Sequence, residues 1–422
     1  MSTPARTRLP GWLLGGSVIA LCMGVMNVAT YGFTILAARL LGPSHYGALA
    51  ALMGLLLVIN VVSLGLQATA ARRVSASPEH TPTIERDILS AGYRSAATLG
   101  VLCLVATPAI DVVLRLDSWV TAALVAVTAV PLTVMGGQAG VLQGERRWTP
   151  LALMYLMSGL GRLACGAAAM VWRPDALGAM LGVAVGAFFP AVVGWFALRN
   201  PRRRSGDRAG EVELPQRRLL GEVAHNSHAL LAFFALSNAD VVIGRMTLDE
   251  HDAGLYAAGL ILAKAVLFLP QFVVVVAFPS MSSAAADRAR HLKSLALVLG
   301  IGAVAVIGAW ALSGLAVVFV GGPEYAAMRS SLWAFAGLGT LLAMLQLMVY
   351  HVLARQQQRT VFVIWGALAA LLATAPLMGS PTGLLAVVVT VDGVLLGVLV
   401  ALSLRSSVAA PAAPARDASL AK

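Results

Sequence analysis

The sequence predicts an all-α polytopic membrane protein with twelve transmembrane helices in two six-helix lobes around a central cavity. Of its 422 residues, 59% are hydrophobic and only 12% are charged, and the mean hydropathy is +0.83. A soluble globular protein is nearer a quarter charged. The apolar residues are gathered in runs of about twenty, the length that crosses roughly 30 Å of hydrocarbon as a helix. Because backbone groups in lipid need partners within the protein, these runs are expected to be helices.

Apolar runs between polar breaks define the predicted spans. They are 11–38, 44–71, 91–113, 118–142, 149–172, 176–198, 226–248, 253–279, 294–320, 329–354, 360–378 and 382–404. Gly and Pro mark two breaks as short hairpins, RLLGPSHYG after the first span and GSPTG near residue 380. The positively charged start, MSTPARTRLP, leads into an apolar stretch too long for a signal peptide, so we expect a retained first helix.

The positive residues are distributed unevenly between the two sides of these spans. With the N-terminus in the cytoplasm, twenty-three of the thirty Lys and Arg residues fall in inner segments and two fall within spans. The other five lie in outer loops: Arg39, Arg115, Arg173, Arg245 and Arg329. Cytoplasmic loops of membrane proteins carry the excess of Lys and Arg. The sequence therefore predicts a multi-pass protein of the cytoplasmic membrane with both termini cytoplasmic.

The longest polar stretch divides the spans six and six. We expect an N-terminal lobe at 1–198, a basic cytoplasmic linker at 199–225, a C-terminal lobe at 226–405 and a disordered Ala/Pro-rich tail at 406–422. A short internal repeat supports a division into two halves. The segments ARLLGPSHYGALAA (38–51) and GRMTLDEHDAGLYAA (244–258) share a pattern, and their arginines, Arg39 and Arg245, are 206 residues apart. Repeats of this kind place a substrate site at their interface.

The charge balance and the motifs exclude several functions. The net charge is +11 and the isoelectric point is near 10.3. The tight basic cluster RNPRRR (199–204) abuts a span, where a topology signal or a contact with membrane lipids belongs, so no nucleic acid is expected. The three cysteines show no metal-ligand spacing, and the chain has no ATP-binding P-loop. We therefore expect no catalytic site, metal or cofactor, and no enzyme activity.

Two cations lie near the middle of predicted spans, where charge is costly and needs a reason. Arg162, in MSGLGRLACGA, is too far from either end of its span to reach the interface. It is either a permanent cation for a phosphate or carboxylate in a central cavity, or half of a structural ion pair. Lys264, in GLILAKAVLFLP, either binds an anion or neutralises Asp240.

Two carboxylates and two amides are the other candidate site residues within the spans. Asp240, in LSNADVVIGR, and Asp392, in VVVTVDGVLLG, are candidates for coupling H⁺ or Na⁺, because a desolvated carboxylate can release and take up a cation. An ion pair or an interhelical hydrogen bond is the alternative for each. Asn27 and Asn238 are expected in related places in the two halves, lining a substrate path.

Two stretches resemble a known family. AARLLGPSHYGALAALMGLLLVINVVSLGLQATAARRVS (37–75) resembles the first outer turn and second helix of the polysaccharide flippases. These belong to the multidrug/oligosaccharidyl-lipid/polysaccharide (MOP) exporter superfamily. Residues 236–283 are similar to the matching region of the second half, with Asn-x-Asp, Gly-x-Tyr and Phe-Pro in order. The outer turn reads PSHYG where the family commonly has an acidic residue.

The resemblance implies a transporter that flips a polyprenyl-pyrophosphate-linked oligosaccharide or polysaccharide precursor, such as an O-antigen unit, by alternating access. It implies that the pyrophosphate enters a cationic cavity, with Arg162 and Lys264 at its depth and Arg39 and Arg245 at its outer mouth. A glycan polymerase or glycosyltransferase is an expected partner in the cell envelope. Two alternatives stay open: an ion-coupled antiporter for drugs or small metabolites, and a membrane scaffold for a glycosyltransferase complex.

Overall fold

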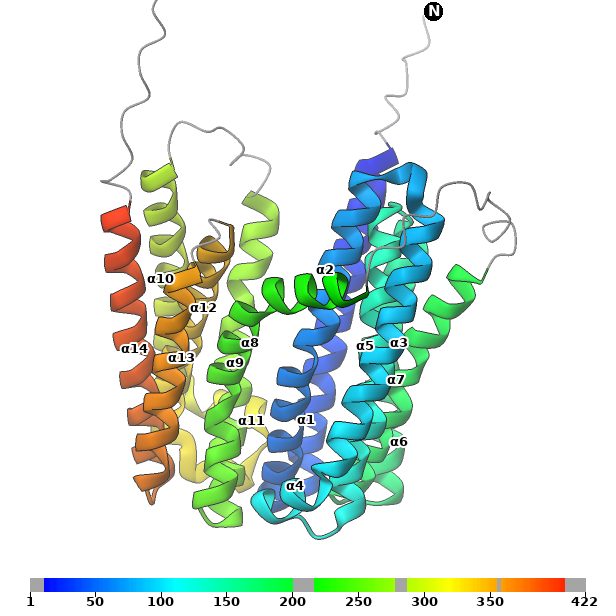
Figure 1. Cartoon of the computed structure of the whole chain (residues 1–422). Helices are drawn as coiled ribbons and strands as arrows, with labels where there is room; N and C mark the ends of the chain where they lie inside the picture. The colour runs from blue at the N-terminus through cyan, green and yellow to red at the C-terminus, as the bar shows by residue number, and fades with distance from the viewer. Residues whose placement is uncertain (1–10, 200–215, 278–286, 355–357, 407–422) are drawn as a thin grey trace, which may run out of the picture.

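The computed structural model describes residues 11–199, 216–277, 287–354 and 358–406, and every regular element within them is helical (Figure 1). The first bundle contains α1 (Gly11–Ile59), α2 (Val61–Ala76), η1 (Pro78–His80), α3 (Thr81–Val105), α4 (Thr107–Leu114), α5 (Trp119–Gly144), α6 (Trp148–Trp172) and α7 (Ala176–Leu198). The second contains α8 (Gln216–Thr247), α9 (Glu250–Ala277), α10 (Asp287–Ala311), α11 (Ser313–Val320), η5 (Pro323–Ser331), α12 (Leu332–Ala354), α13 (Gln358–Thr374), η6 (Ala375–Leu377) and α14 (Pro381–Ser406).

The first helix reverses direction at a glycine. Gly42 has φ 67° and ψ 175°, a conformation that L side chains rarely adopt, and Pro43 follows it. The α1 residues before and after Gly42 therefore form two arms joined at the predicted hairpin. Eleven stretches of the described chain are long and apolar enough to cross a membrane, and the first, Val18–Ala76, has 59 residues and contains both arms. The sequence predicted twelve spans, and the two counts differ at this double-length segment.

Several helices depart from the predicted bounds. α3 begins at Thr81 and α8 at Gln216, each ten residues before the predicted span, and α8 thus takes up part of the predicted linker. The runs 91–113 and 294–320 are each broken into a long and a short helix, α3 with α4 and α10 with α11. Hydropathy locates only the segment that matches hydrocarbon, whereas a helix continues through polar turns beyond it.

The two halves of the chain repeat the same architecture at the offset of 206 residues seen in the sequence. α3 and α10 end 206 residues apart, and α4 and α11 begin and end at the same offset. In the first bundle α1 packs on α6, α6 on α7, α7 on α5, and α5 on both α2 and α3. In the second, α8 packs on α13, α13 on α14, α14 on α12, and α12 on both α9 and α10, which is the same order of contacts.

Glycines allow the helices of the first bundle to approach closely. Gly136 and Gly140 lie one turn apart on α5, and a Cβ added to them would come within 2.2 Å of the Ser63 carbonyl oxygen and 2.5 Å of the Gln67 carbonyl oxygen on α2. Without a hydrophobic driving force in lipid, such small-residue contacts provide the van der Waals packing between helices.

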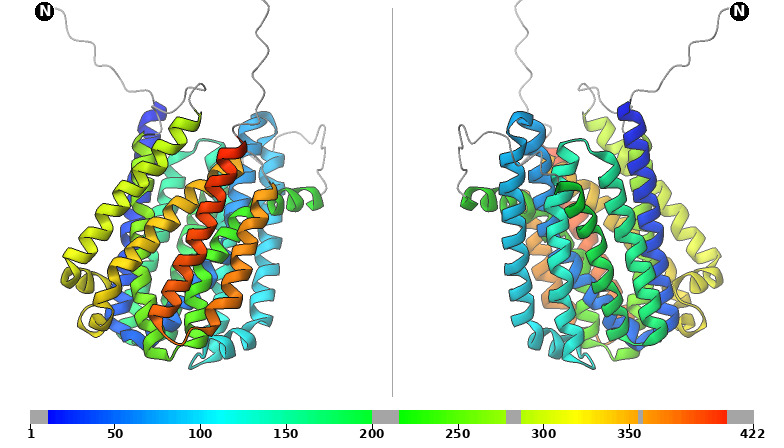
Figure 2. Two further views of the ribbon diagram at one scale, coloured as in Figure 1. Left: turned by 90° about the vertical axis from the view of Figure 1, so that its left-hand side faces the viewer. Right: turned by 90° about the vertical axis from the view of Figure 1, so that its right-hand side faces the viewer.

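The bundles stand side by side, with α8 and α9 next to α1 and α2 (Figures 1 and 2). The described chain ends, at Gly11 and Ser406, lie at one end of the molecule, called here the terminal end. The opposite end, called the hairpin end, holds Gly42 and the last turns of α4 and α8. The helices of the two bundles are farther apart at the terminal end and converge at the hairpin end (Figure 1).

Four of the five exposed tryptophans among the described residues lie towards the hairpin end. Trp119 begins α5, Trp172 ends α6, Trp310 is in the last turn of α10 and Trp333 is in the first turn of α12, and all four side chains are exposed. Tryptophan is enriched at the interface between hydrocarbon and water. Exposed indoles at this end of four helices are expected where the helices leave a bilayer.

Candidate functional site

Lys264 is held by a neutral amide in the second bundle. It lies near the middle of α9, is partly buried, and its Nζ donates a hydrogen bond of 2.8 Å to the Oδ1 of Asn238 on α8. The Asn238 side chain is 3% exposed, and its Nδ2 donates to the Phe234 carbonyl at 2.8 Å, one turn earlier. The bond to Phe234 therefore fixes the orientation of the Asn238 amide, and its oxygen points to the ammonium group of Lys264.

Asp240 has a different partner from the one that the sequence suggested. No ion pair or hydrogen bond joins it directly to Lys264, although the two lie within electrostatic reach. Its Oδ2 accepts from the Tyr256 hydroxyl at 2.9 Å, and its Oδ1 accepts from the Val241 amide at 2.8 Å. Residues two apart on a helix point about 200° apart, so Asn238 and Asp240 face different surroundings. Asp240 thus makes the interhelical hydrogen bond that was one of its alternative readings, and it interacts with Lys264 electrostatically without a direct bond.

Asp392 joins Asp240 from a third helix. It lies on α14, is 1% exposed, and interacts electrostatically with both Asp240 and Tyr256. Its Oδ1 has no hydrogen-bond partner among the described residues. We call Asp240, Tyr256 and Asp392 the acidic cluster. Two buried carboxylates within electrostatic reach of each other repel when both are ionised, and a bound cation or proton relieves this repulsion.

The Lys264 side of α9 faces the first bundle. Phe268, one turn after Lys264, makes an edge-on contact with Tyr31 of α1, with ring centroids 6.0 Å apart. Asn27 lies one turn before Tyr31 on the same face of α1 and is partly buried. We call these four residues, together with Asn238, the interlobe site.

The second bundle meets α1 at Asn238 as well. A Cβ added to Gly54, in the second arm of α1, would lie 3.6 Å from the Asn238 Cβ. Two predicted residues, Asn238 and Lys264, thus lie where the two bundles meet, and Asn27 lies one turn from Tyr31 on the face of α1 that contacts Phe268. We had expected Asn27 and Asn238 in equivalent places in the repeat. They are not equivalent, because the position 206 residues before Asn238 is Gly32.

Arg162 lies inside the first bundle. The exposed residues of α6, which include Leu153, Leu160 and Val171, form one stripe, and Arg162 projects from the opposite side. Tyr155, two turns earlier, shares this inner face and accepts a hydrogen bond of 2.7 Å from Gln67 of α2. Arg162 is partly buried and has no hydrogen bond or ion pair with any residue that the structure describes. Within the part of the chain that the structure describes, the ion pair that was the alternative reading is therefore not seen.

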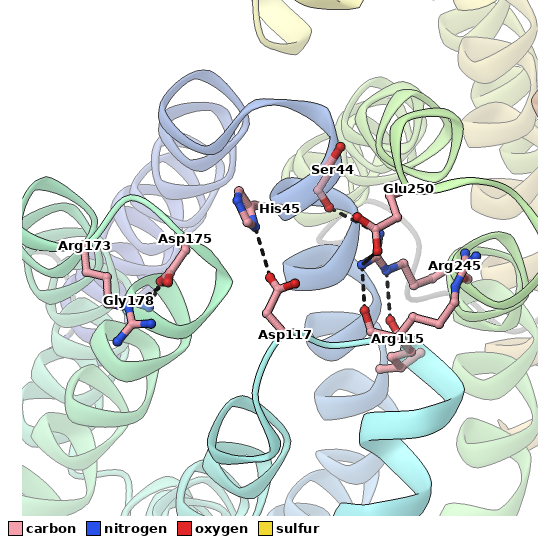
Figure 3. A network of polar contacts seen from close by, with 10 residues as sticks. Ser44, His45, Arg115, Asp117, Arg173, Asp175, Gly178, Arg245 and Glu250 are labelled. Carbon is pink, nitrogen blue, oxygen red and sulfur yellow. Dashed lines mark hydrogen bonds and ion pairs between the residues drawn. The ribbon is translucent and has the colours of Figure 1, made fainter.

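Arg39 and Arg245 lie at the hairpin end, and both donate to backbone carbonyls of the other bundle. The exposed Arg39 donates through Nη2 to the Val318 carbonyl at 2.7 Å. Arg245 is 3% exposed and donates to carbonyls at the end of α4 and in the hairpin (Figure 3). Neither guanidinium is directed to the interlobe site in this conformation.

Three residues of these networks were not selected from the sequence. Tyr256 belongs to the Gly-x-Tyr pattern at the start of α9, and that pattern was the available signal, although the tyrosine reads as an ordinary apolar side chain. Phe268 carries no signal of its own, because aromatic residues are common in spans. Arg115 looks like a plain loop cation until its guanidinium is seen to donate to the carbonyls of Arg245 and Leu248.

The fold is that of known transporters. The lipid II flippase MurJ in an inward closed conformation matches with a TM-score of 0.67 and 12% identity, over 92% of this chain and 87% of that chain. An outward-facing multidrug resistance MATE transporter of the MOP superfamily matches with a TM-score of 0.59 and 13% identity, over 93% and 94%. A MOP superfamily transporter from Pyrococcus furiosus, described as having a binding pocket of reverse polarity that suggests a different function, matches at 0.55 and 13%, over 92% and 94%.

The sequence places the chain in a family. A search of curated proteins finds no match to the sequence. The family model described as polysaccharide biosynthesis protein matches residues 13–285, and the chain belongs to that family. The chain thus belongs to the polysaccharide biosynthesis family that the resemblance predicted, and it shares its fold with transporters of the MOP superfamily.

Proposed function

We propose that this protein flips a polyprenyl-pyrophosphate-linked oligosaccharide or polysaccharide precursor across the cytoplasmic membrane by alternating access. The family assigns the chain to polysaccharide biosynthesis, and the fold is that of transporters that include a lipid II flippase. A precursor assembled on a lipid in the cytoplasm has to cross the membrane with its charged head, and a cavity between two lobes is a way to carry it.

The observation that carries the proposal is the pairing of Lys264 with an amide. Lys264 bonds the neutral Asn238 and interacts with Asp240 only electrostatically, so its ammonium group is not tied to a carboxylate by a direct bond. Because Lys264 is partly exposed and lies where the bundles meet, it can donate to a phosphate oxygen that enters between them. Arg162 supplies a second cation, without a protein partner among the described residues, inside the first bundle.

We further propose how the chain is arranged in the membrane. Two lobes at 1–198 and 226–405 cross it six times each, if the two arms of α1 count as separate spans. The terminal end is cytoplasmic, because the Lys and Arg excess belongs to that side. The convergence of the helices at the hairpin end then corresponds to a state that is open inward. An O-antigen or capsule-type precursor is a suitable cargo, and a glycan polymerase or glycosyltransferase is a suitable partner.

The acidic cluster is our candidate for ion coupling. Asp240 and Asp392 come from different helices, are at most 3% exposed, and interact with each other. Cation or proton binding relieves the repulsion between them, and release restores it, so occupancy can be linked to the relative positions of α8 and α14.

An antiporter for organic cations is the competing function. Such a protein needs carboxylates and aromatic faces that a cation can reach. In this conformation Asp240 and Asp392 are almost completely buried, and Asp240 is already bonded to Tyr256. The accessible charge at the interlobe site is the cation of Lys264, which favours an anionic cargo.

Proteoliposomes test the proposal. The purified protein is reconstituted with a fluorescent polyprenyl-pyrophosphate glycan, and the fraction reached by a membrane-impermeant quencher is followed over time. We expect the protein to expose lipid from the inner leaflet that empty vesicles keep protected. No flipping of this lipid, together with accumulation of a cationic dye by the same vesicles, would support the antiporter instead.

A further inference from the structure

Arg245 joins the end of α8 to the other bundle through backbone carbonyls. Its Nε donates to the Leu114 carbonyl at 2.9 Å, its Nη2 to the Arg115 carbonyl at 3.0 Å, and its Nη1 to the Ser44 carbonyl at 3.3 Å (Figure 3). Its only ion pair among the described residues is with Glu250 of its own bundle, at 3.2 Å. Three of the four contacts thus cross between the bundles.

Arg115 makes the same kind of contact in the opposite direction. It follows the last residue of α4 with φ 47°, a left-handed conformation that ends the helix. Its guanidinium donates to the carbonyls of Arg245 and Leu248 at the end of α8. The last carbonyls of a helix have no partner within it and attract cations. Each helix end therefore supplies acceptors for the arginine of the other.

A second contact of this type is related to the first by the internal repeat. Arg39 is 206 residues before Arg245, and α11 is displaced by the same number from α4. Arg39 donates to the Val318 carbonyl in the last turn of α11, as Arg245 does to the last residue of α4. The Tyr325 hydroxyl adds a bond of 2.8 Å to the Ala38 carbonyl, again between bundles.

These bonds can form only while the bundles touch at the hairpin end. The contact is made close by glycine, since a Cβ added to Gly254 of α9 would lie 1.9 Å from the Pro43 carbonyl oxygen. When the bundles separate, each guanidinium and carbonyl can bond to water instead. Because bonds to water replace the bonds between the bundles, the net free energy that holds the closed state is small. The closed state can therefore form and can also be released.

We propose that Arg245 with Arg115, and Arg39 by the repeat, form paired gate clamps that keep the hairpin end closed and that open together during transport. The inference relies on the alternating access of the proposed function. It gives Arg39 and Arg245 a role other than the substrate binding expected from the sequence. It also explains why Arg245, in the last turn of α8, is almost completely buried.

Spin-label distances measure the state of the gate without any cargo. Labels are attached to Asp117→Cys and His251→Cys, exposed positions of the two bundles at the hairpin end, after replacement of the native cysteines Cys22, Cys103 and Cys165. We expect Arg245→Ala to raise the long-distance, open population at least roughly tenfold, because the variant loses three hydrogen bonds between the bundles and one charge-assisted bond alone would give about this effect. Arg173→Ala is the matched control, because Arg173 is an arginine of the same end that pairs with Asp175 in its own bundle.

Further variants separate a clamp from its alternatives. Glu250→Gln removes only the ion pair and should leave the distances close to wild type, and Arg39→Ala, at an exposed site, should open the gate without risk to folding. Unchanged distances in both Arg245→Ala and Arg39→Ala, or an equal change in Arg173→Ala, would overturn the proposal. If the distances respond but no glycan is flipped, the gate stands and the proposed cargo fails.

Discussion

Replacing Lys264 by methionine removes the accessible charge of the interlobe site and keeps most of the side-chain length. A hydrogen bond to a charged group contributes about 1.5 to 3 kcal/mol, which corresponds to roughly 10-fold to 150-fold in binding. Because Lys264 is only partly buried, screening by water places the expected loss near the lower end. We therefore predict that Lys264→Met binds a polyprenyl pyrophosphate about tenfold more weakly than wild type.

The assay is equilibrium binding of that lipid to the purified protein in detergent. Lys293→Met is the matched control, because Lys293 is an exposed lysine of the same bundle near the terminal end. Loss of Lys264 also leaves the Asn238 oxygen without its donor, so thermal melting has to accompany the binding curve. Equal affinities for wild type and Lys264→Met, with both proteins folded, would refute the assignment of Lys264 to the cargo phosphate.

Three other predictions follow from the described contacts. Arg162→Ala should abolish rescue of a flippase-deficient strain while expression stays normal, and Arg162→Lys should keep part of it; full rescue by Arg162→Ala would remove this residue from the mechanism. Asp240→Asn and Asp392→Asn should each reduce the dependence of flipping on H⁺ or Na⁺ gradients, measured in proteoliposomes, and an unchanged dependence would leave them a structural role. Gly140→Val should cost about 1 to 3 kcal/mol and lower the melting temperature, because its side chain would overlap α2. Gly366→Val, where a Cβ meets open space, should melt like wild type, and equal melting of the two variants would contradict the packing.

The helical membrane fold could be predicted because an apolar run of this length has few conformations other than a helix in lipid. The offset of 206 residues, first seen between two arginines, extends in the structure to whole helices. The reversal within the double-length first segment was predicted from Gly42 and Pro43, and the backbone angle at Gly42 confirms it. Hydropathy carries no information about such an angle.

The sequence indicated which polar residues lie within the spans, but it did not indicate which partners their side chains bond. Lys264 and Asp240 were singled out because charge in a span is rare, yet the sequence does not show that one bonds Asn238 and the other Tyr256. A helix allows several partners at the same depth, and the choice depends on rotation and on the packing of α8 against α9. Arg245 illustrates the same limit, because its acceptors are main-chain atoms, which no side-chain pattern records.

The most direct measurement compares the flipping of two lipids that differ only in the head. One carries a glycan on polyprenyl pyrophosphate, and the other carries the same glycan on a neutral polyprenyl ether. We predict that reconstituted protein flips the pyrophosphate lipid at least tenfold faster, as one charge-assisted contact would give, and that Lys264→Met loses most of this preference. Equal rates for the two lipids in the wild-type protein would contradict the claim that the site between the bundles receives an anion.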